Sequence, residues 1–125
     1  MKQSISIKNA PAPVGSYSQA VLSNNTLYIS GQIAINPFDG EFNTESIETE
    51  THQVMKNILA LLDAADMDVT NLVKCSIFLD DMDNFSVVDK IYSSYFKDSF
   101  PARETMEVSK LPKGVRVEIS GIGVK

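Results

Sequence analysis

The sequence predicts an α+β fold in which two helices pack on one face of a mostly antiparallel sheet. Apolar residues in segment 47–65 recur at helical spacing, whereas apolar and polar residues alternate over 73–79, as they do in a strand. Further segments of both kinds give the element order β-β-α-β-α-β-β. No stretch has the Gly, Ser or Pro bias of an interdomain linker, so residues 1–125 are expected to form one domain.

The first two strands are predicted to form a hairpin around an asparagine pair at 24–25. Its first arm would span residues 17–22. Its second arm would contain 27–29 and end at Gly31. A surface turn is expected over 36–40, because its proline presets φ and its Asp-Gly pair tolerates positive φ.

The first helix is predicted over 47–65, with Glu48 and Glu50 near its start, where the helix dipole favours negative charge. Asn84 is expected to cap a second helix that ends before Pro101. The buried stripe of this helix would consist of Phe85, Val88, Ile91, Tyr92, Tyr95 and Phe96.

Three more strands complete the expected sheet. The strand at 73–79 would bury Val73, Cys75, Ile77 and Leu79. Two others are expected over 105–109 and around 115–119, joined by a turn at 111–114. With both helices on one face and no third layer in so short a chain, the other face is expected to be buried against copies of the chain. Any cleft would then lie at a subunit boundary.

The composition restricts the classes of partner. A net charge of -5 and a pI near 4.7 disfavour nucleic acid, because phosphates repel such a protein. The single cysteine can form no intrachain disulfide, segment 1–14 lacks the apolar core of a signal peptide, and no apolar run could span a bilayer. The sequence therefore suggests a cytoplasmic protein that binds neither nucleic acid nor membrane.

Familiar catalytic motifs are absent from the sequence. There is no glycine-rich phosphate loop, no Cys/His cluster with metal spacing and no GxSxG elbow, and no metal or cofactor is expected. His52, the only histidine, is expected to be a solvated residue on the polar side of its helix. It cannot support two-histidine ribonuclease chemistry. Cys75 lies on the apolar face of its strand, where burial makes a thiol unreactive.

Two charged residues are candidates for chemistry. Arg103 follows Phe100-Pro101-Ala102 at a strand start, where a fixed guanidinium could grip a carboxylate through two hydrogen bonds or form a surface ion pair. Glu118, on the polar side of a strand, could act as a general base toward water, although the residues alone favour a solvated charge. From the residues alone, the chain is a small acidic α+β domain with a candidate anion clamp.

Four groups of segments are distinctive in their order and spacing. They are Ala-Pro-Val-Gly-Ser-Tyr-Ser-Gln-Ala at 12–20, Leu-Tyr-Ile-Ser-Gly-Gln at 27–32 with the turn at 36–40, Phe-Pro-Ala-Arg at 100–103, and Leu-Pro-Lys at 111–113 leading to Val-Glu-Ile at 117–119. Together these segments resemble the RidA (YjgF-like) family. The likeness covers almost the whole chain, so it identifies residues 1–125 as a single RidA-like domain.

This resemblance implies a chorismate-mutase-like fold and a homotrimer with clefts between its subunits. It also implies hydrolysis of reactive 2-imino acids, such as 2-iminobutanoate and 2-iminopropanoate, to 2-keto acids and ammonia without a cofactor. An iminium carbon is already electrophilic, so such an enzyme has mainly to fix the carboxylate, position a water molecule and move protons.

The resemblance also implies roles for residues. Arg103 would bind the substrate carboxylate, and Tyr17 would contribute a hydroxyl to the same pocket. Glu118 would orient or deprotonate the attacking water. The backbone at Gly31 and Thr105 would bond the substrate. Without the resemblance, Tyr17 would be interpreted as a half-buried aromatic residue and Gly31 as a turn.

Three positions depart from the family pattern. Asp89 stands where asparagine is frequent, and a carboxylate in the substrate cleft cannot donate a hydrogen bond and would repel an acid. Thr105 replaces a cysteine of several members, a change that a backbone role would survive. Asp66 occupies a helix-end position where glycine is common.

Two other functions stay open at this point. One is a ligand-sensing or partner-binding trimer without turnover, which a displaced Glu118 would favour. The other is a ribonuclease or translation inhibitor, an activity also attributed to some relatives, against which the acidic pI and the missing histidine pair weigh.

Overall fold

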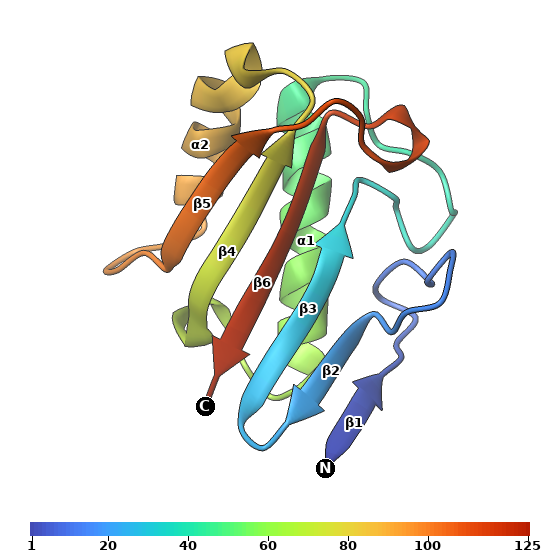
Figure 1. The fold of residues 1–125 in the computed structure, drawn as a ribbon, viewed down its shortest axis with the longest axis vertical. Coiled ribbons are helices and arrows are strands. Elements are labelled where there is room, and N and C mark those ends of the chain that lie inside the picture. The colour runs from blue at the N-terminus through green and yellow to red at the C-terminus, as the bar shows by residue number, and fades with distance from the viewer.

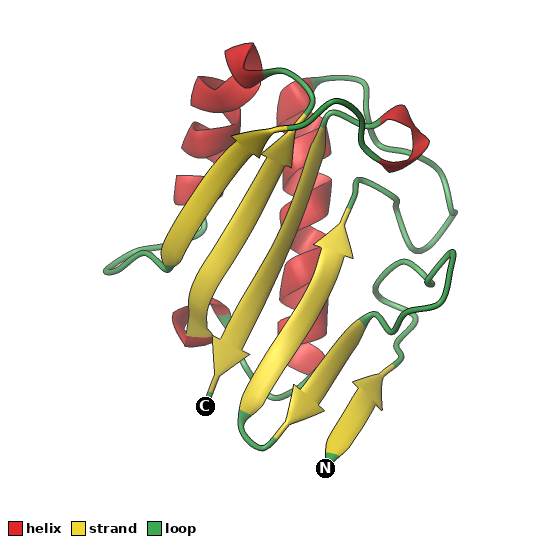
Figure 2. Ribbon diagram, viewed as in Figure 1, coloured by secondary structure: helices red, strands yellow, loops and turns green.

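The computed structural model describes all 125 residues as one sheet with two helices on one of its faces (Figure 1 and Figure 2). The strands are β1 (Lys2–Ile5), β2 (Ala20–Ser23), β3 (Thr26–Gln32), β4 (Leu72–Leu79), β5 (Ala102–Glu107) and β6 (Val117–Val124), and the helices are α1 (Ile47–Ala64) and α2 (Phe85–Ser93). The predicted α+β class is confirmed. Neither helix is both long and apolar enough to cross a lipid bilayer.

The strand order of the sheet is β1-β2-β3-β6-β4-β5. All neighbours are antiparallel except β4 and β5, which run parallel and are joined through α2, since parallel strands need a crossover. The prediction missed β1. This edge strand has four residues, three of them exposed, so the segment carries no apolar alternation.

The β2–β3 hairpin turns at Asn24, whose φ of 54° is in the left-handed region, as the asparagine pair predicted. However, β2 begins at Ala20 and not at residue 17, because the preceding Gln19 side chain is buried and binds the N-terminal segment. Its Nε2 donates hydrogen bonds to the carbonyls of Ile7, Ala10 and Pro11. Residues 6–19, between β1 and β2, therefore form a loop that the Gln19 side chain holds in place, called the pinned loop below.

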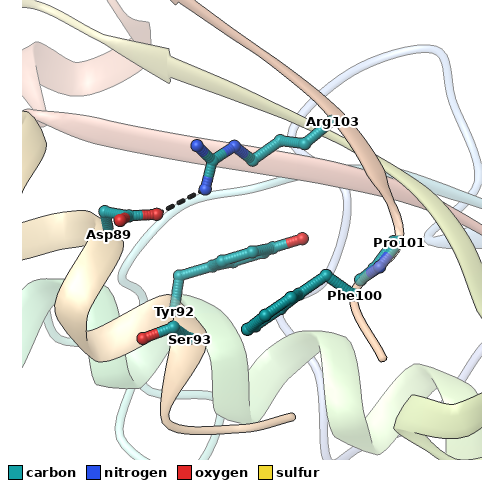
Figure 3. A pocket seen from close by; sticks show the side chains of 6 residues that line it. All are labelled: Asp89, Tyr92, Ser93, Phe100, Pro101 and Arg103. Carbon is teal, nitrogen blue, oxygen red and sulfur yellow. Dashed lines mark hydrogen bonds and ion pairs between the residues drawn. The ribbon is translucent and has the colours of Figure 1, made fainter. Parts of the chain in front are cut away.

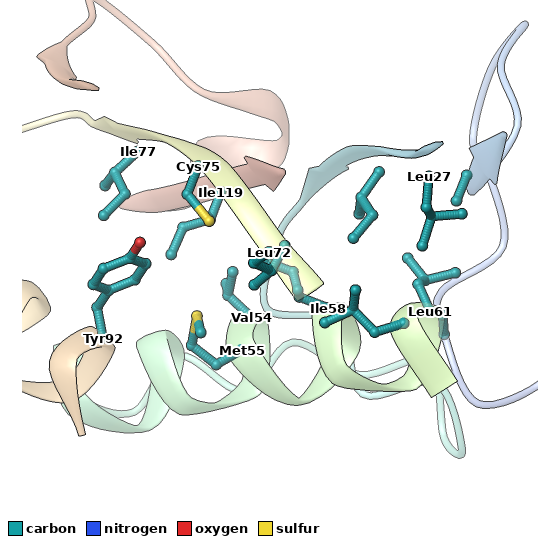
Figure 4. Close-up of a cluster of buried hydrophobic side chains, with 14 of the residues drawn as sticks. Leu27, Val54, Met55, Ile58, Leu61, Leu72, Cys75, Ile77, Tyr92 and Ile119 are labelled. Carbon is teal, nitrogen blue, oxygen red and sulfur yellow. The ribbon is translucent and has the colours of Figure 1, made fainter. Parts of the chain in front are cut away.

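Helix α1 agrees with its prediction to within one residue. Ser46 caps it by accepting a hydrogen bond from the Thr49 amide, and its apolar face packs against the sheet (Figure 4). The core contains 22 buried residues, among them Ile58 of α1, Ile77 of β4 and Ile119 of β6.

Asp66 lies at the left-handed position after α1, with φ 56°, and the amides of Asp66 and Met67 bond back to Asp63 and Leu62 as in a Schellman motif. A side chain disfavours this backbone conformation, so Asp66→Gly is expected to raise the free energy of unfolding by up to about 1 kcal/mol. Urea denaturation measures the change. Asp66→Ala, the matched control, should show no gain, and an equal gain in both variants would assign the effect to the lost charge.

Strand β4 is confirmed, but the burial of Val73 was predicted wrongly. A register shift between Leu72 and Lys74 against β6 leaves Val73 47% exposed, and Leu72 takes its place in the core. A bulge of this kind inserts one residue and shifts the alternation, which periodicity alone cannot reveal.

Helix α2 is shorter than expected and ends at Ser93. Its Asn84 makes no capping hydrogen bond, because a 3-10 turn over Met82–Asn84, capped by Asp81, leads directly into the helix. Of the six residues predicted for the buried stripe, three are buried (Val88, Tyr92 and Phe96) and three are only partly buried (Phe85, Ile91 and Tyr95).

The last two strands differ from their predicted limits. Strand β5 begins at Ala102, so Arg103 lies inside it, and β6 continues to Val124. The alternation of burial in β6 continues through Gly121 and Gly123, which take core-facing positions. A Cβ on either would approach a core side chain to 3.1 Å, so both fit tightly against the core. The connection around 111–114 joins two strands that β4 separates.

Glu50 has a larger role than the dipole interaction predicted for it. It is fully buried, and its carboxylate accepts hydrogen bonds from the amides of Arg116 and Val117 and from Nε of Arg116, at 2.7 to 3.1 Å. The first turns of α1 are thereby joined to the beginning of β6.

Candidate functional site

Five of the six predicted site residues are divided between two clefts, and the sixth, Thr105, lines neither. The arginine cleft, of about 370 Å³, lies between α2 and β5 and is lined by Asp89, Tyr92, Ser93, Phe100, Pro101 and Arg103 (Figure 3). The glutamate cleft, of about 330 Å³, is lined by Val14, Tyr17, Ser30, Gly31, Ile33, Pro112 and Glu118. The two clefts share no residue.

The register of the sheet explains this separation. Arg103 pairs with Cys75 of β4, which is buried beneath the helices, whereas Glu118 pairs with Phe78 on the opposite face. Paired residues in a sheet point to the same side. Arg103 and Glu118 of one chain therefore lie on opposite faces of the sheet.

Arg103 is held in place by three neighbours on α2. Its Nη1 donates a hydrogen bond to Asp89, and its guanidinium carbon lies 5.4 Å from the ring centroids of both Phe85 and Tyr92. Aromatic rings attract a cation placed near them. The Nε and Nη2 groups make no hydrogen bond within the chain, so this edge can bind a carboxylate through two parallel hydrogen bonds.

Phe85 and Tyr92 were predicted only as core residues, and their contact with Arg103 was missed. A sequence signal existed: they lie four residues before and three residues after Asp89, on one side of a predicted helix. Once Asp89 binds Arg103, these neighbours on the same side of the helix also come close to its guanidinium.

Below the guanidinium, the cleft floor is buried. Burial raises the pKa of Cys75 and that of Tyr92, whose hydroxyl points toward the β4 strand (Figure 4), and the unreactive character predicted for Cys75 fits this environment. The hydroxyls of Tyr92 and Thr105 are buried without a hydrogen-bond partner. The backbone role expected for Thr105 stays a prediction.

In the glutamate cleft, Glu118 lies directly over Gly31. A Cβ on Gly31 would come within 2.3 Å of Glu118 Oε2, so a side chain at position 31 would displace this carboxylate from its observed position. Burial raises the pKa of Glu118. Strand β3 was predicted to end at Gly31. It continues to Gln32, and its register against β6 shifts between Ile29 and Gln32. The close neighbour of Gly31 is the Glu118 side chain, and the backbone role expected for Gly31 stays a prediction.

Tyr17 completes this cleft from the pinned loop. It is 49% exposed, its amide bonds to the Gly15 carbonyl, and its hydroxyl accepts a hydrogen bond from the Val14 amide at 3.4 Å. The phenol is therefore presented beside Glu118, with its proton available to a ligand.

His52 is not the freely solvated residue that was predicted. It is partly buried, and its Nδ1 lies 2.7 Å from the hydroxyl of Tyr95. It belongs to neither cleft.

Comparison with known proteins gives full-length matches. A family model described as endoribonuclease L-PSP matches residues 7–125. A human protein named 2-iminobutanoate/2-iminopropanoate deaminase is 42% identical over 125 residues, all of this chain and 91% of its own length, and a RutC family protein of Pyrococcus horikoshii is 44% identical over all of this chain and 99% of its own. The crystal structure of a Rid family protein of unknown function from Yersinia pestis is 48% identical with a TM-score of 0.96, over the full length of both chains. The chain therefore belongs to the RidA (YjgF-like) family, the family that the segments around Tyr17, Gly31, Arg103 and Glu118 already resembled.

Proposed function

We propose that this protein hydrolyses reactive 2-imino acids, such as 2-iminobutanoate and 2-iminopropanoate, to 2-keto acids and ammonia. The observation that carries the proposal is the fixed guanidinium of Arg103 with one free edge, a ready partner for a carboxylate. The names of relatives above 40% identity support the same reaction.

The complete site would be shared between two subunits. Arg103 of one chain would face Tyr17, Gly31 and Glu118 of the next, because one chain holds the two clefts on opposite faces of its sheet. Contacts between two different surfaces repeat around a ring, and we propose a homotrimer. The open sheet face exposes Tyr28, Met106 and Val124 by 38 to 50%, an apolar surface that such assembly would cover.

In the proposed reaction, the Nε–Nη2 edge of Arg103 holds the substrate carboxylate, and Glu118 accepts a proton from water as its oxygen bonds to the iminium carbon. The C=N electron pair moves to nitrogen. Glu118 then returns the proton to nitrogen. As the C–N bond breaks and the C=O bond forms, Glu118 takes the proton of the new hydroxyl and passes it to the departing ammonia, which leaves as ammonium. Tyr17 donates a hydrogen bond to the reacting groups, and the backbone at Gly31 and Thr105 bonds the substrate.

Only the ionised form of Glu118 can accept the proton. Its raised pKa makes it a stronger base than an exposed carboxylate, and hydrolysis should decline as the pH falls through that pKa.

Two alternatives are weighed against this proposal. A ligand-binding protein without turnover was expected to show a cleft with Arg103 but a displaced Glu118. Within one chain Glu118 does lie outside the arginine cleft, so the deaminase needs Glu118 of a neighbouring subunit, and the assay of imine hydrolysis separates the two functions. The family model's description names ribonuclease activity. A net charge of -5 disfavours RNA binding, and the single histidine, hydrogen-bonded to Tyr95, cannot provide the histidine pair of two-histidine ribonuclease chemistry. We propose a small-molecule substrate, no cofactor and a cytoplasmic setting.

The direct test measures ammonia release from 2-iminobutanoate generated in situ by a pyridoxal-phosphate enzyme acting on threonine. The purified protein is expected to accelerate this release above the spontaneous rate. Release at the spontaneous rate, together with salt-dependent binding of RNA, would contradict the proposal and favour the ribonuclease alternative.

A further inference from the structure

The arginine cleft already contains one charge of each sign. Asp89 accepts a hydrogen bond from Nη1 of Arg103. Its side chain is 41% exposed, so its carboxylate also borders the space that a ligand would occupy (Figure 3). The other residues that line this cleft are uncharged. The cleft is therefore neutral before a ligand enters.

The glutamate cleft adds no positive charge. Its one charged lining residue is Glu118, so the two clefts together contribute one guanidinium and two carboxylates. A substrate's first carboxylate can use the free edge of Arg103. A second carboxylate would have no cation to pair with. It would lie near the partly desolvated carboxylates of Asp89 and Glu118, which would repel it.

The walls near Arg103 suit an uncharged side chain instead. Phe100 is 65% exposed and lines the cleft. Its ring packs edge-on against Phe96, with 5.9 Å between the ring centroids, and Pro101 extends this apolar wall. An aliphatic side chain could cover this surface without any charge being desolvated.

We propose that Asp89 acts as a charge filter, which admits 2-imino and 2-keto monocarboxylates with uncharged side chains to Arg103 and rejects dicarboxylates. This inference rests on the proposed function and names the substrate class for that same site. Asp89 takes part by repelling a second negative charge, while its hydrogen bond holds the guanidinium.

Two ligands of similar size test the filter: 2-ketohexanoate, a monocarboxylate, and 2-ketoglutarate, a dicarboxylate. By titration calorimetry, the unchanged protein should bind 2-ketoglutarate at least about tenfold more weakly. Asp89→Asn removes the charge but keeps an oxygen that can accept the Arg103 hydrogen bond. It should reduce the difference at least about threefold, mainly through tighter binding of the dicarboxylate.

Asp63→Asn is the matched control, since it makes the same change of net charge at an exposed position on α1 that lines neither cleft. Equal binding of both ligands by the unchanged protein, or an equal change in both variants, would overturn the charge filter while leaving the deaminase proposal intact. Failure to bind 2-ketohexanoate, together with no acceleration of imine hydrolysis, would instead reject the proposed function, and the filter with it.

Discussion

Mixed assemblies of Arg103→Ala and Glu118→Gln subunits are expected to recover about a quarter of the normal imine hydrolysis, although each variant alone should lose about a hundredfold or more. The loss is expected because one change removes the proposed carboxylate anchor and the other removes the proposed base. The recovery follows because Arg103 and Glu118 of one chain lie on opposite faces of the sheet. In a random mixture, about one site in four would combine an intact arginine with an intact glutamate from the next subunit.

The measurement compares ammonia release by each variant with that of subunits unfolded and refolded together. Arg103→Ala refolded with the double variant Arg103→Ala, Glu118→Gln is the control, because no site in that mixture contains an arginine. Absence of recovery in a mixture whose subunits have demonstrably exchanged would contradict a shared site.

Glu50→Ala is expected to lower the free energy of unfolding by about 3 kcal/mol, the largest stability change that we expect from a single charged residue. The substitution leaves two backbone amides and the Arg116 guanidinium without their acceptor, and two of the three groups are amides at the start of a core strand. Unsatisfied buried donors cost more than the hydrogen bond itself contributes.

Urea denaturation gives the size of this change, and Glu48→Ala is the matched control. Glu48 lies in the same turn of α1 but is exposed, so its removal should cost less than about 0.5 kcal/mol. Similar losses in the two variants would mean that the helix dipole, and not the buried contact, accounts for the effect of Glu50.

Local patterns predicted most of the fold. The limits of α1 and the buried residues Cys75, Ile77 and Leu79 follow from periodicity, because each element turns one face to the core. The errors occur where pairing with a distant strand determines the local structure. Val73 is exposed because β4 has a bulge where it pairs with β6, and β1 forms by pairing with the edge of β2.

The sequence predicted that Tyr17, Gly31 and Glu118 share a pocket with Arg103, but it did not predict that the two groups lie on opposite faces of one chain. Side-chain alternation assigns Arg103 and Glu118 to faces only when the order β6-β4-β5 is known, and that order depends on a parallel pairing over a long separation. The aromatic partners of Arg103 were missed because the apolar character of Phe85 and Tyr92 assigned them to the buried stripe, although their spacing around Asp89 placed them on the same side of the helix.

The placement of Arg103 and Glu118 on opposite sides of one sheet has a consequence for how activity depends on abundance. A lone subunit cannot present both groups to the same substrate molecule, however stable it is. With the shared site proposed above, turnover would follow mass action: dilution below the association range is expected to lower the rate per chain, and newly made chains would stay inactive until they associate. The two-sided sheet would thereby couple the proposed chemistry to the concentration of the protein.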